Sequence, residues 1–280
     1  MRSIIFNIKT LFGIRPADCQ RVCGEEMRNP FSLNNAWLSI RDGVIEGFGA
    51  MDTFPAGESF DEETDAHGGL LLPAFCDSHT HLVYTGHREQ EWVDKINGLS
   101  YAEVARRGGG ILNSADLLHR TSEEELFRES MERVEEIAAK GTGCVEIKSG
   151  YGLNTADELK MLRVIRRISE TGRLKVVSTF LGAHAVSRQF QGRQSEYVDM
   201  LIGEMLPEVG KERLADYVDV FCDKGFFTPE EMKRILEAAE KYGMKPKVHV
   251  DELAAGRGLQ VAVEHNALSV DHLESMPESD

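Results

Sequence analysis

The 280-residue chain carries 47 acidic against 32 Lys and Arg side chains, a formal net charge of −15, and 41% of its residues are hydrophobic. The length suits one large α/β domain with a small appendage. The negative charge argues against nucleic acid or an anionic membrane as a partner, and no apolar run approaches the roughly 20 residues that span a bilayer. The five cysteines show no regular spacing. They favour free thiols in a reducing compartment, so we expect a cytoplasmic protein.

Residues 1–66 have the pattern of short strands joined by turns. The segments 36–41 and 44–48 flank Asp42-Gly43, a dipeptide that suits the type I′ turn of a β-hairpin. Because so short a segment does not make a stable sheet domain alone, we interpret it as the N-terminal part of a composite β-sandwich that needs further strands.

From residue 67 onward the pattern changes to repeated strand–loop–helix units. Capping-box sequences mark three helix starts: Ser122 with Glu125, Thr155 with Glu158, and Thr228 with Glu231. Short β-rich runs lie at 70–75, 144–147, 174–177, 217–221, 247–250 and 268–270. Repeating β/α units of this kind predict a parallel sheet.

A doubly wound sheet and a (β/α)8 barrel both fit this repeat, and the polar residues favour the barrel. Nearly every predicted strand ends in a reactive group: His79 and His81, Glu146 and Lys148, His184, Asp223, His249, and His272. Barrels place their sites at the ends of many strands, whereas doubly wound sheets use one switch point. We therefore predict an α/β TIM-like barrel over 67–280. Only about six units are present, so we expect the chain to be truncated before the last strands.

The His79-x-His81 pair carries the first chemical signal. In a strand, residues i and i+2 point to the same face, and neutral imidazoles are preferred ligands of zinc and iron. Taken singly, each histidine is better explained as a polar residue at a strand end, and the pair alone fits either explanation. Together with His249, however, they predict a catalytic metal site. Glu252 is then placed for proton transfer, and His272 for ligation or for hydrogen bonding to an oxyanion.

Several motifs resemble the imidazolonepropionase family of the amidohydrolase superfamily over essentially the whole chain. They are DSHTHL at 77–82, GHREQE at 86–91, GGGI at 108–111, VEIKSGYGL at 145–153, TFLGAHA at 179–185, KVHVDE at 247–252 and LSVDHL at 268–273. The His-x-His pair is common to the superfamily, whereas the EIKSGYGL run is much more particular. Ala74 and Ser78 depart from the residues commoner in the family without touching a ligand.

The resemblance implies roles for individual residues. His79, His81 and His249 would hold one zinc or iron ion, and Glu252 and His272 would act on the water, the ring nitrogen or the carbonyl. Four residues would bind substrate: Arg88 and Tyr151 its propionate, Tyr101 and His184 its ring. The implied reaction is hydrolysis of the lactam C–N bond of 4-imidazolone-5-propanoate to N-formimidoyl-L-glutamate, in histidine degradation.

The resemblance also implies a fourth metal ligand, an aspartate beyond residue 280. A homodimer is expected as well, but the sequence does not identify its interface. Two alternatives stay open: a related deaminase of a nucleobase-like ring, and an inactive metal-binding fragment. The sequence does not decide which metal is used, or whether the chain is a natural product, a partial gene or a cloned fragment. We interpret Glu146 and Lys148 as a buried structural pair rather than as part of the site.

Overall fold

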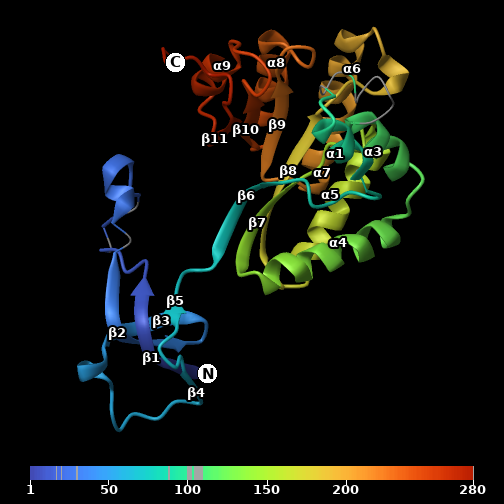
Figure 1. The fold of residues 1–280 in the computed structure, drawn as a ribbon. Coiled ribbons are helices and arrows are strands. Elements are labelled where there is room, and N and C mark those ends of the chain that lie inside the picture. The colour runs from blue at the N-terminus through green and yellow to red at the C-terminus, as the bar shows by residue number, and fades with distance from the viewer. Residues whose placement is uncertain are drawn as a thin grey trace. The chain divides into compact units, whose positions relative to one another are not determined.

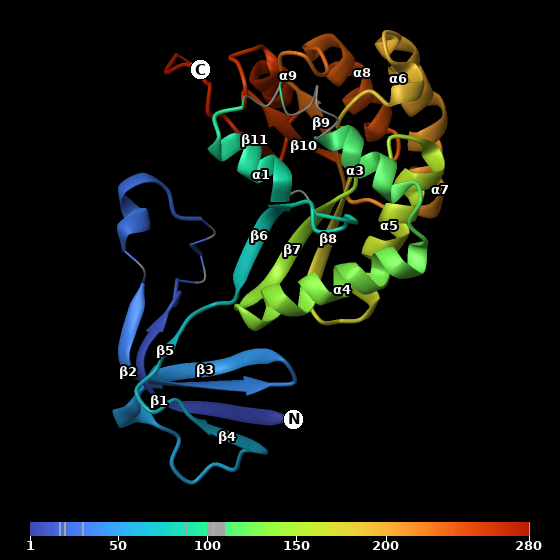
Figure 2. The same ribbon diagram turned by 45° about the vertical axis from the view of Figure 1, so that its right-hand side comes forward.

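The computed structural model describes residues 1–16, 18–19, 21–29, 31–87, 89–99, 103 and 110–279. The chain divides into two compact units, Met1–Ala74 and Phe75–Asp280 (Figures 1 and 2). The division falls eight residues after the boundary expected from the sequence. Each unit has its own sheet and its own hydrophobic core.

The first unit contains a five-stranded sheet with the order β3-β2-β1-β4, in which β5 also pairs with β1. Its strands are β1 (Arg2–Phe12), β2 (Ser32–Arg41), β3 (Val44–Ala50), β4 (Glu62–Asp65) and β5 (Leu70–Leu71), with 3-10 turns at Gly24–Arg28 and Met51–Thr53. The predicted hairpin is confirmed: β2 and β3 are antiparallel, and Asp42 and Gly43 both have positive φ, 51° and 80°, as a type I′ turn requires.

The expected first barrel strand at 70–75 is wrong. Leu70 and Leu71 pair with β1 in the first unit, and the first strand of the second unit is β6 (Phe75–Thr80). Pro73 lies between them. Because proline has no backbone N–H to donate to a ladder, it ends one strand before the next begins.

The second unit is built on six parallel strands in the order β11-β10-β9-β8-β7-β6 (Figure 1). After β6 come β7 (Thr142–Lys148), β8 (Lys175–Ala183), β9 (Tyr217–Cys222), β10 (Lys245–Val250) and β11 (Ser269–His272). This sequential order, with a helix between most pairs, is that of a (β/α) barrel. The predicted fold class is therefore confirmed.

Helices cover the outer face of this sheet (Figure 2). The helices of the second unit are α1 (Glu89–Ile96), α3 (Ile111–Leu118), α4 (Glu123–Ala139), α5 (Thr155–Glu170), α6 (Gln194–Met200), α7 (Leu206–Glu212), α8 (Pro229–Glu240) and α9 (Gly258–Glu264), with a 3-10 turn at Arg188–Phe190 and a π-helical turn, η4, at Leu201–Met205. Of these, α4, α5, α8 and α9 pack against the strands. In the part of the chain that the structure describes, none of the helices combines the length and apolar character needed to cross a bilayer. All five cysteines are free thiols, as expected.

Two of the three predicted caps are confirmed, and one is wrong. Ser122 caps α4, and Thr228 forms a complete capping box with Glu231 on α8. The cap of α5, however, is Asn154, whose side chain accepts a hydrogen bond from the backbone N–H of Asp157. An asparagine oxygen satisfies the free N–H groups of a first turn as well as a threonine hydroxyl does, so the Thr-x-x-Glu pattern was one residue out of register.

Candidate metal centre and active site

Five histidines meet at the C-terminal ends of the strands in the second unit. His79 lies in β6 and His81 directly after it, His184 follows β8, His249 lies in β10, and His272 ends β11. Parallel strands of a barrel place their C-terminal ends on one face, so residues nearly 200 positions apart in the sequence become neighbours. The predicted convergence of strand-end histidines is therefore present in the structure.

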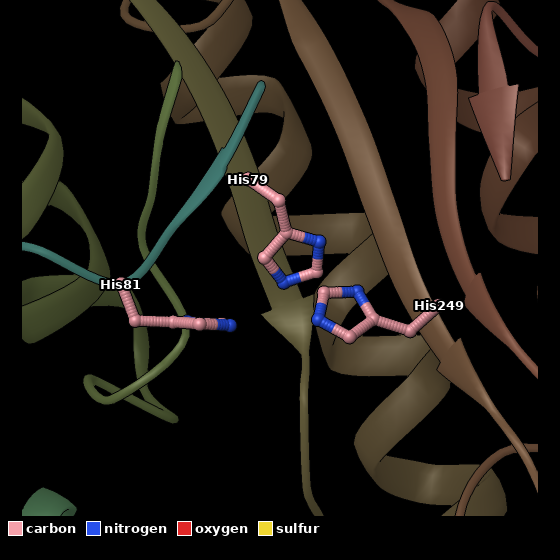
Figure 3. A group of neighbouring side chains, drawn as sticks. All are labelled: His79, His81 and His249. Atoms are coloured by element: carbon pink, nitrogen blue, oxygen red, sulfur yellow. The ribbon is translucent and has the colours of Figure 1, made fainter. Parts of the chain in front are cut away.

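Three of these imidazoles face one another closely enough to hold a single ion. One ring nitrogen from each of His79, His81 and His249 lies within 4.8 Å of the other two, and Figure 3 shows the three rings turned toward a common space. The ring centroids of His79 and His249 are 4.5 Å apart, and those of His79 and His81 are 5.4 Å apart. Three nitrogen ligands with open positions are typical of a catalytic metal site rather than of a structural one.

Two carboxylates fix the orientation of two of these imidazoles from behind. His79 Nδ1 donates to Asp271 Oδ2 at 2.9 Å, and His249 Nδ1 lies 2.7 Å from Asp219 Oδ2. Asp219 Oδ1 also accepts from the backbone N–H of His249 at 3.1 Å. Because a carboxylate oxygen lies next to each Nδ1, Nε2 of each ring is left for a metal, as in the carboxylate–histidine–metal arrangement of many metalloenzymes.

The charges around the three imidazoles fit a metal cation. Burial would raise the pKa of Asp219, but His249 and Lys148 lower it well below its usual range. Burial acts the same way on Asp271, whose bond to His79 and proximity to Lys148 lower its pKa to about 2. These two carboxylates and Glu146 surround the ammonium of Lys148, and Lys247 adds a second positive charge near Asp271, so the negative charges still outnumber the positive ones. A bound di- or trivalent cation would offset them.

His81 fits the same interpretation. Its Nδ1 is buried and has no hydrogen-bonding partner among the described residues. Burial, together with the nearby imidazoles of His184 and His249, holds the pKa of His81 well below its usual range. The ring is therefore neutral near pH 7, which is the form that binds a metal.

This depressed pKa predicts that the metal-free protein loses stability in mild acid. Because the pKa of His81 is lower in the folded than in the unfolded state, the unfolded chain takes up the proton first as the pH falls below about 6.5. Stability is therefore complete above that value and declines beneath it. We expect the free energy of unfolding to fall between pH 6.5 and 5.5 by at most about 1.4 kcal/mol per unit. Urea denaturation in the presence of a chelator measures this slope.

The matched variants for this experiment are His81→Gln and His265→Gln. The first removes the group responsible, so the slope should flatten, whereas the second removes a histidine next to α9 and should leave the slope unchanged. A slope in His81→Gln equal to that of the original protein would show that another group causes the acid sensitivity.

Glu252 and His272 lie together beside the three imidazoles. Glu252 Oε2 is 3.6 Å from His272 Nε2, and the ring of His272 lies 5.0 Å from that of His249 and 5.3 Å from that of His79, centroid to centroid. The carboxylate of Asp223 accepts from the backbone N–H groups of residues 252–254 and so fixes the loop that carries Glu252. His272 has a φ of +81°, unusual for a residue with a side chain, which is the kind of strain that gathers at functional sites.

The rings of Tyr151 and His184 lie next to His81 and together form an aromatic wall. The rings of His184 and His81 are stacked, with centroids 5.0 Å apart and planes at 11°, and Tyr151 lies 5.3 Å from His184. His184 Nδ1 donates to the carbonyl of Gly150 at 3.0 Å. Both side chains are buried, at 8% and 6% exposure. The wall thus places a flat aromatic surface next to the metal ligands, which suits a planar ring.

Glu158 organises the loop that carries Tyr151. Its carboxylate accepts from the backbone N–H groups of Gly150, Gly152 and Leu153 at 2.8–3.1 Å, and burial raises its pKa against the effect of these bonds. The residue that the sequence indicated as half of a capping box therefore holds the loop that carries Tyr151. Gly152 allows the close approach, because a Cβ atom there would lie 2.3 Å from the backbone nitrogen of Glu158.

Arg88 and Tyr101, the other two predicted substrate-binding residues, lie outside the described residues. Sequence reasoning missed Asp219 and Asp271, and it interpreted Lys148 as part of a structural pair only. The signal for Asp219 was a carboxylate in the otherwise apolar run of β9, since charged residues are rarely buried unless they are paired. Asp271 gave a weaker signal, because it directly precedes a predicted site residue.

The barrel and the three histidines at its strand ends define a metal-dependent hydrolase of the amidohydrolase type, an enzyme class that acts on cyclic amide bonds. The fold is similar to that of 5-methylcytosine deaminase from Klebsiella pneumoniae, with a TM-score of 0.61 and 18% identity over 94% of this chain and 55% of that one. It is also similar to an uncharacterized metal-dependent hydrolase from Pyrococcus furiosus, with a TM-score of 0.56 and 13% identity over 96% and 72%. No family model matches the chain.

Curated relatives give the narrower assignment. Imidazolonepropionase of Christiangramia forsetii is 50% identical over all 280 residues, and that of Flavobacterium johnsoniae is 49% identical. The chain spans 68% of the length of each of them. The chain belongs to the imidazolonepropionase family.

Proposed function

We propose that the protein hydrolyses the lactam C–N bond of 4-imidazolone-5-propanoate to N-formimidoyl-L-glutamate, as a step in histidine degradation. The observation that carries the proposal is the group formed by His79, His81 and His249, with the Glu252–His272 pair beside it. The identity to relatives that bear the name imidazolonepropionase supports this choice of substrate over other cyclic amides.

His79, His81 and His249 would hold one zinc or iron ion. When bound, such an ion lowers the pKa of water toward neutrality and polarises a carbonyl. The other groups of the site do the rest of the chemistry. Glu252 accepts a proton from the water whose oxygen forms the new bond to the ring carbonyl carbon. His272 donates a hydrogen bond to the oxyanion that develops on that carbonyl.

The second half of the reaction breaks the C–N bond of the ring. Glu252 returns the proton to the departing nitrogen, so that water is added across the bond and no other reactant is needed. His184 with Tyr101 would hold the planar ring, and Tyr151 with Arg88 would bind the propionate, since a planar guanidinium matches a carboxylate. The proposed substrate is a small molecule.

The proposal is tested by metal content and turnover in the same preparation. We expect one zinc or iron ion per chain, loss of the ultraviolet absorbance of freshly generated 4-imidazolone-5-propanoate, and a product heavier by one water in mass spectrometry. Removing the metal with a chelator should abolish turnover, and adding it back should restore it. A protein that holds metal but leaves this substrate unchanged would contradict the proposed reaction.

The same assay separates the rival deaminase function. The likeness to 5-methylcytosine deaminase shows the fold alone, at 18% identity. Release of ammonia from cytosine-like or guanine-like rings, without hydrolysis of the imidazolone, would favour a deaminase. Metal binding with neither reaction would favour an inactive metal-binding protein.

A further inference from the structure

Lys148 lies at the centre of a buried cluster of charges beneath the proposed metal centre. Its side chain, at the end of β7, is completely buried. Its Nζ is 2.9 Å from Glu146 Oε1, 2.9 Å from Asp219 Oδ2 and 3.6 Å from Asp271 Oδ2. The three carboxylates come from β7, β9 and β11, so one ammonium group joins three strands of the barrel.

Two of these contacts use the same oxygen atoms that face the imidazoles. Asp219 Oδ2 lies between Lys148 Nζ and His249 Nδ1, and Asp271 Oδ2 lies between Lys148 Nζ and His79 Nδ1. Each carboxylate is therefore a bridge from the ammonium to a histidine. The two bridges reach two of the three imidazoles that face one another at the metal centre.

The positive charge of Lys148 stabilises the carboxylates of Asp219 and Asp271, which a neutral side chain would not do. Asp219 is fully buried and the side chain of Asp271 is 14% exposed, so neither is neutralised by water alone. The ammonium group lies within hydrogen-bonding distance of Glu146 and Asp219, and its charge acts on Asp271 across 3.6 Å. Without that charge, two desolvated carboxylates would repel each other and turn away or take up protons, and the imidazoles would lose their fixed acceptors.

Glu146 anchors the ammonium. Its Oε1 accepts from Lys148 and from the hydroxyl of Thr179 on β8, and its backbone carbonyl accepts from the hydroxyl of Thr80 at 2.7 Å. Thr80 lies between His79 and His81 in the sequence. The cluster is thus tied to the segment 79–81, which carries two of the proposed ligands.

We propose that Lys148 is a positioning residue of the metal centre, which holds Asp219 and Asp271 in place so that His249 and His79 present Nε2 to the ion. This inference rests on the proposed function, because it assumes that these imidazoles bind the metal. It assigns to Lys148 an effect on the metal centre through two carboxylates, without contact to the substrate.

Cobalt(II) binding tests the proposal, since the visible absorption of this ion reports the geometry of its ligands. We expect Lys148→Met to displace Asp219 and Asp271, and so to weaken cobalt affinity by about 10- to 100-fold in competition with a chelator, the usual loss when the carboxylate partners of ligating histidines are disturbed. We also expect the visible spectrum to change. The control is Lys160→Met on α5. The side chain of Lys160 is 14% exposed and contacts Asp157 and the backbone carbonyls of Leu118 and Thr121. The affinity and spectrum of this variant should match those of the original protein.

Because Lys148→Met leaves buried carboxylates without a counter-charge, it is paired with the variant Glu146→Gln/Lys148→Met. This double variant removes one charge of each sign, which is better tolerated than removal of one partner alone. It should fold and still show the weakened affinity and the altered spectrum. Cobalt affinity within twofold of the original in a folded Lys148 variant, with an unchanged spectrum, would overturn the proposal.

Nitrogen-15 NMR of the histidines, recorded without metal, separates this inference from the proposed function. The structure predicts that His79 and His249 carry their proton on Nδ1 in the original protein, and that both lose this preference in the double variant but not in Lys160→Met. If the original protein binds no cobalt, the proposed metal site is wrong. The tautomers of His79 and His249 would still show whether Lys148 positions the two carboxylates. Unchanged tautomers in the double variant would contradict that role whatever the metal result.

Discussion

Replacing Glu252 by glutamine is expected to lower kcat for imidazolone hydrolysis by about 10²- to 10⁴-fold, the usual contribution of a general acid–base group, while metal content stays the same. Glutamine has nearly the same shape but does not accept the proton of the attacking water. The backbone N–H of residue 252 still donates to Asp223 Oδ2, at 2.8 Å, so the loop should keep its position. Steady-state kinetics and metal analysis of one preparation measure both quantities.

The control for this variant is Glu237→Gln on α8, which makes the same chemical change in a side chain that is 53% exposed. It should leave kcat and metal content unchanged. A kcat in Glu252→Gln close to that of the original protein would remove Glu252 from the mechanism. A large loss of metal in the same variant would instead make Glu252 a ligand or a support of the ligands.

The ligand group could be predicted from the sequence because its geometry is local. Two histidines separated by one residue near a strand end must lie on one side, and His249 follows from the rule that the strands of a barrel end on one face. Neither inference requires knowledge of how distant side chains pack. The structure accordingly brings together the three residues that the sequence indicated.

The supporting residues depend on packing between strands, and the sequence alone does not contain that information. Asp219 meets His249 because β9 and β10 are neighbours, but Asp271 meets His79 because β11 and β6, the two ends of the sheet order, approach each other around the barrel. Nothing within either segment indicates such a contact. Lys148 joins the two pairs only once both are in place.

Glu158 shows a second limit of sequence reasoning, because one pattern has two physical outcomes. A Glu three residues after Thr155 fits a capping box, yet its carboxylate binds three backbone N–H groups of the preceding loop. Both arrangements satisfy donors near a helix start. Gly152 decides between them, because the absence of a Cβ atom there lets the loop approach the helix closely enough to reach the carboxylate.

Because of this close approach, we expect Gly152→Ala to destabilise the protein strongly. A Cβ atom at position 152 would lie 2.3 Å from the backbone nitrogen of Glu158 and 2.5 Å from the carbonyl carbon of Asp157. Backbone atoms of a helix do not move aside as a flexible side chain does, so the loop must retreat and lose bonds to Glu158. We expect a loss of about 3 kcal/mol in the free energy of unfolding, measured by urea denaturation.

The same substitution should affect substrate binding more than metal binding. Tyr151 precedes Gly152 and faces His184, whereas the proposed metal ligands lie in or directly after β6 and in β10, so KM should rise while metal content stays constant. Gly203→Ala in η4 is the control, because a Cβ atom there meets nothing within 4 Å. It should stabilise the protein by about 0.5–1 kcal/mol, since alanine has less backbone freedom to lose than glycine. Equal stability of the two variants would mean that the loop is not held against α5 as the contacts of Glu158 indicate.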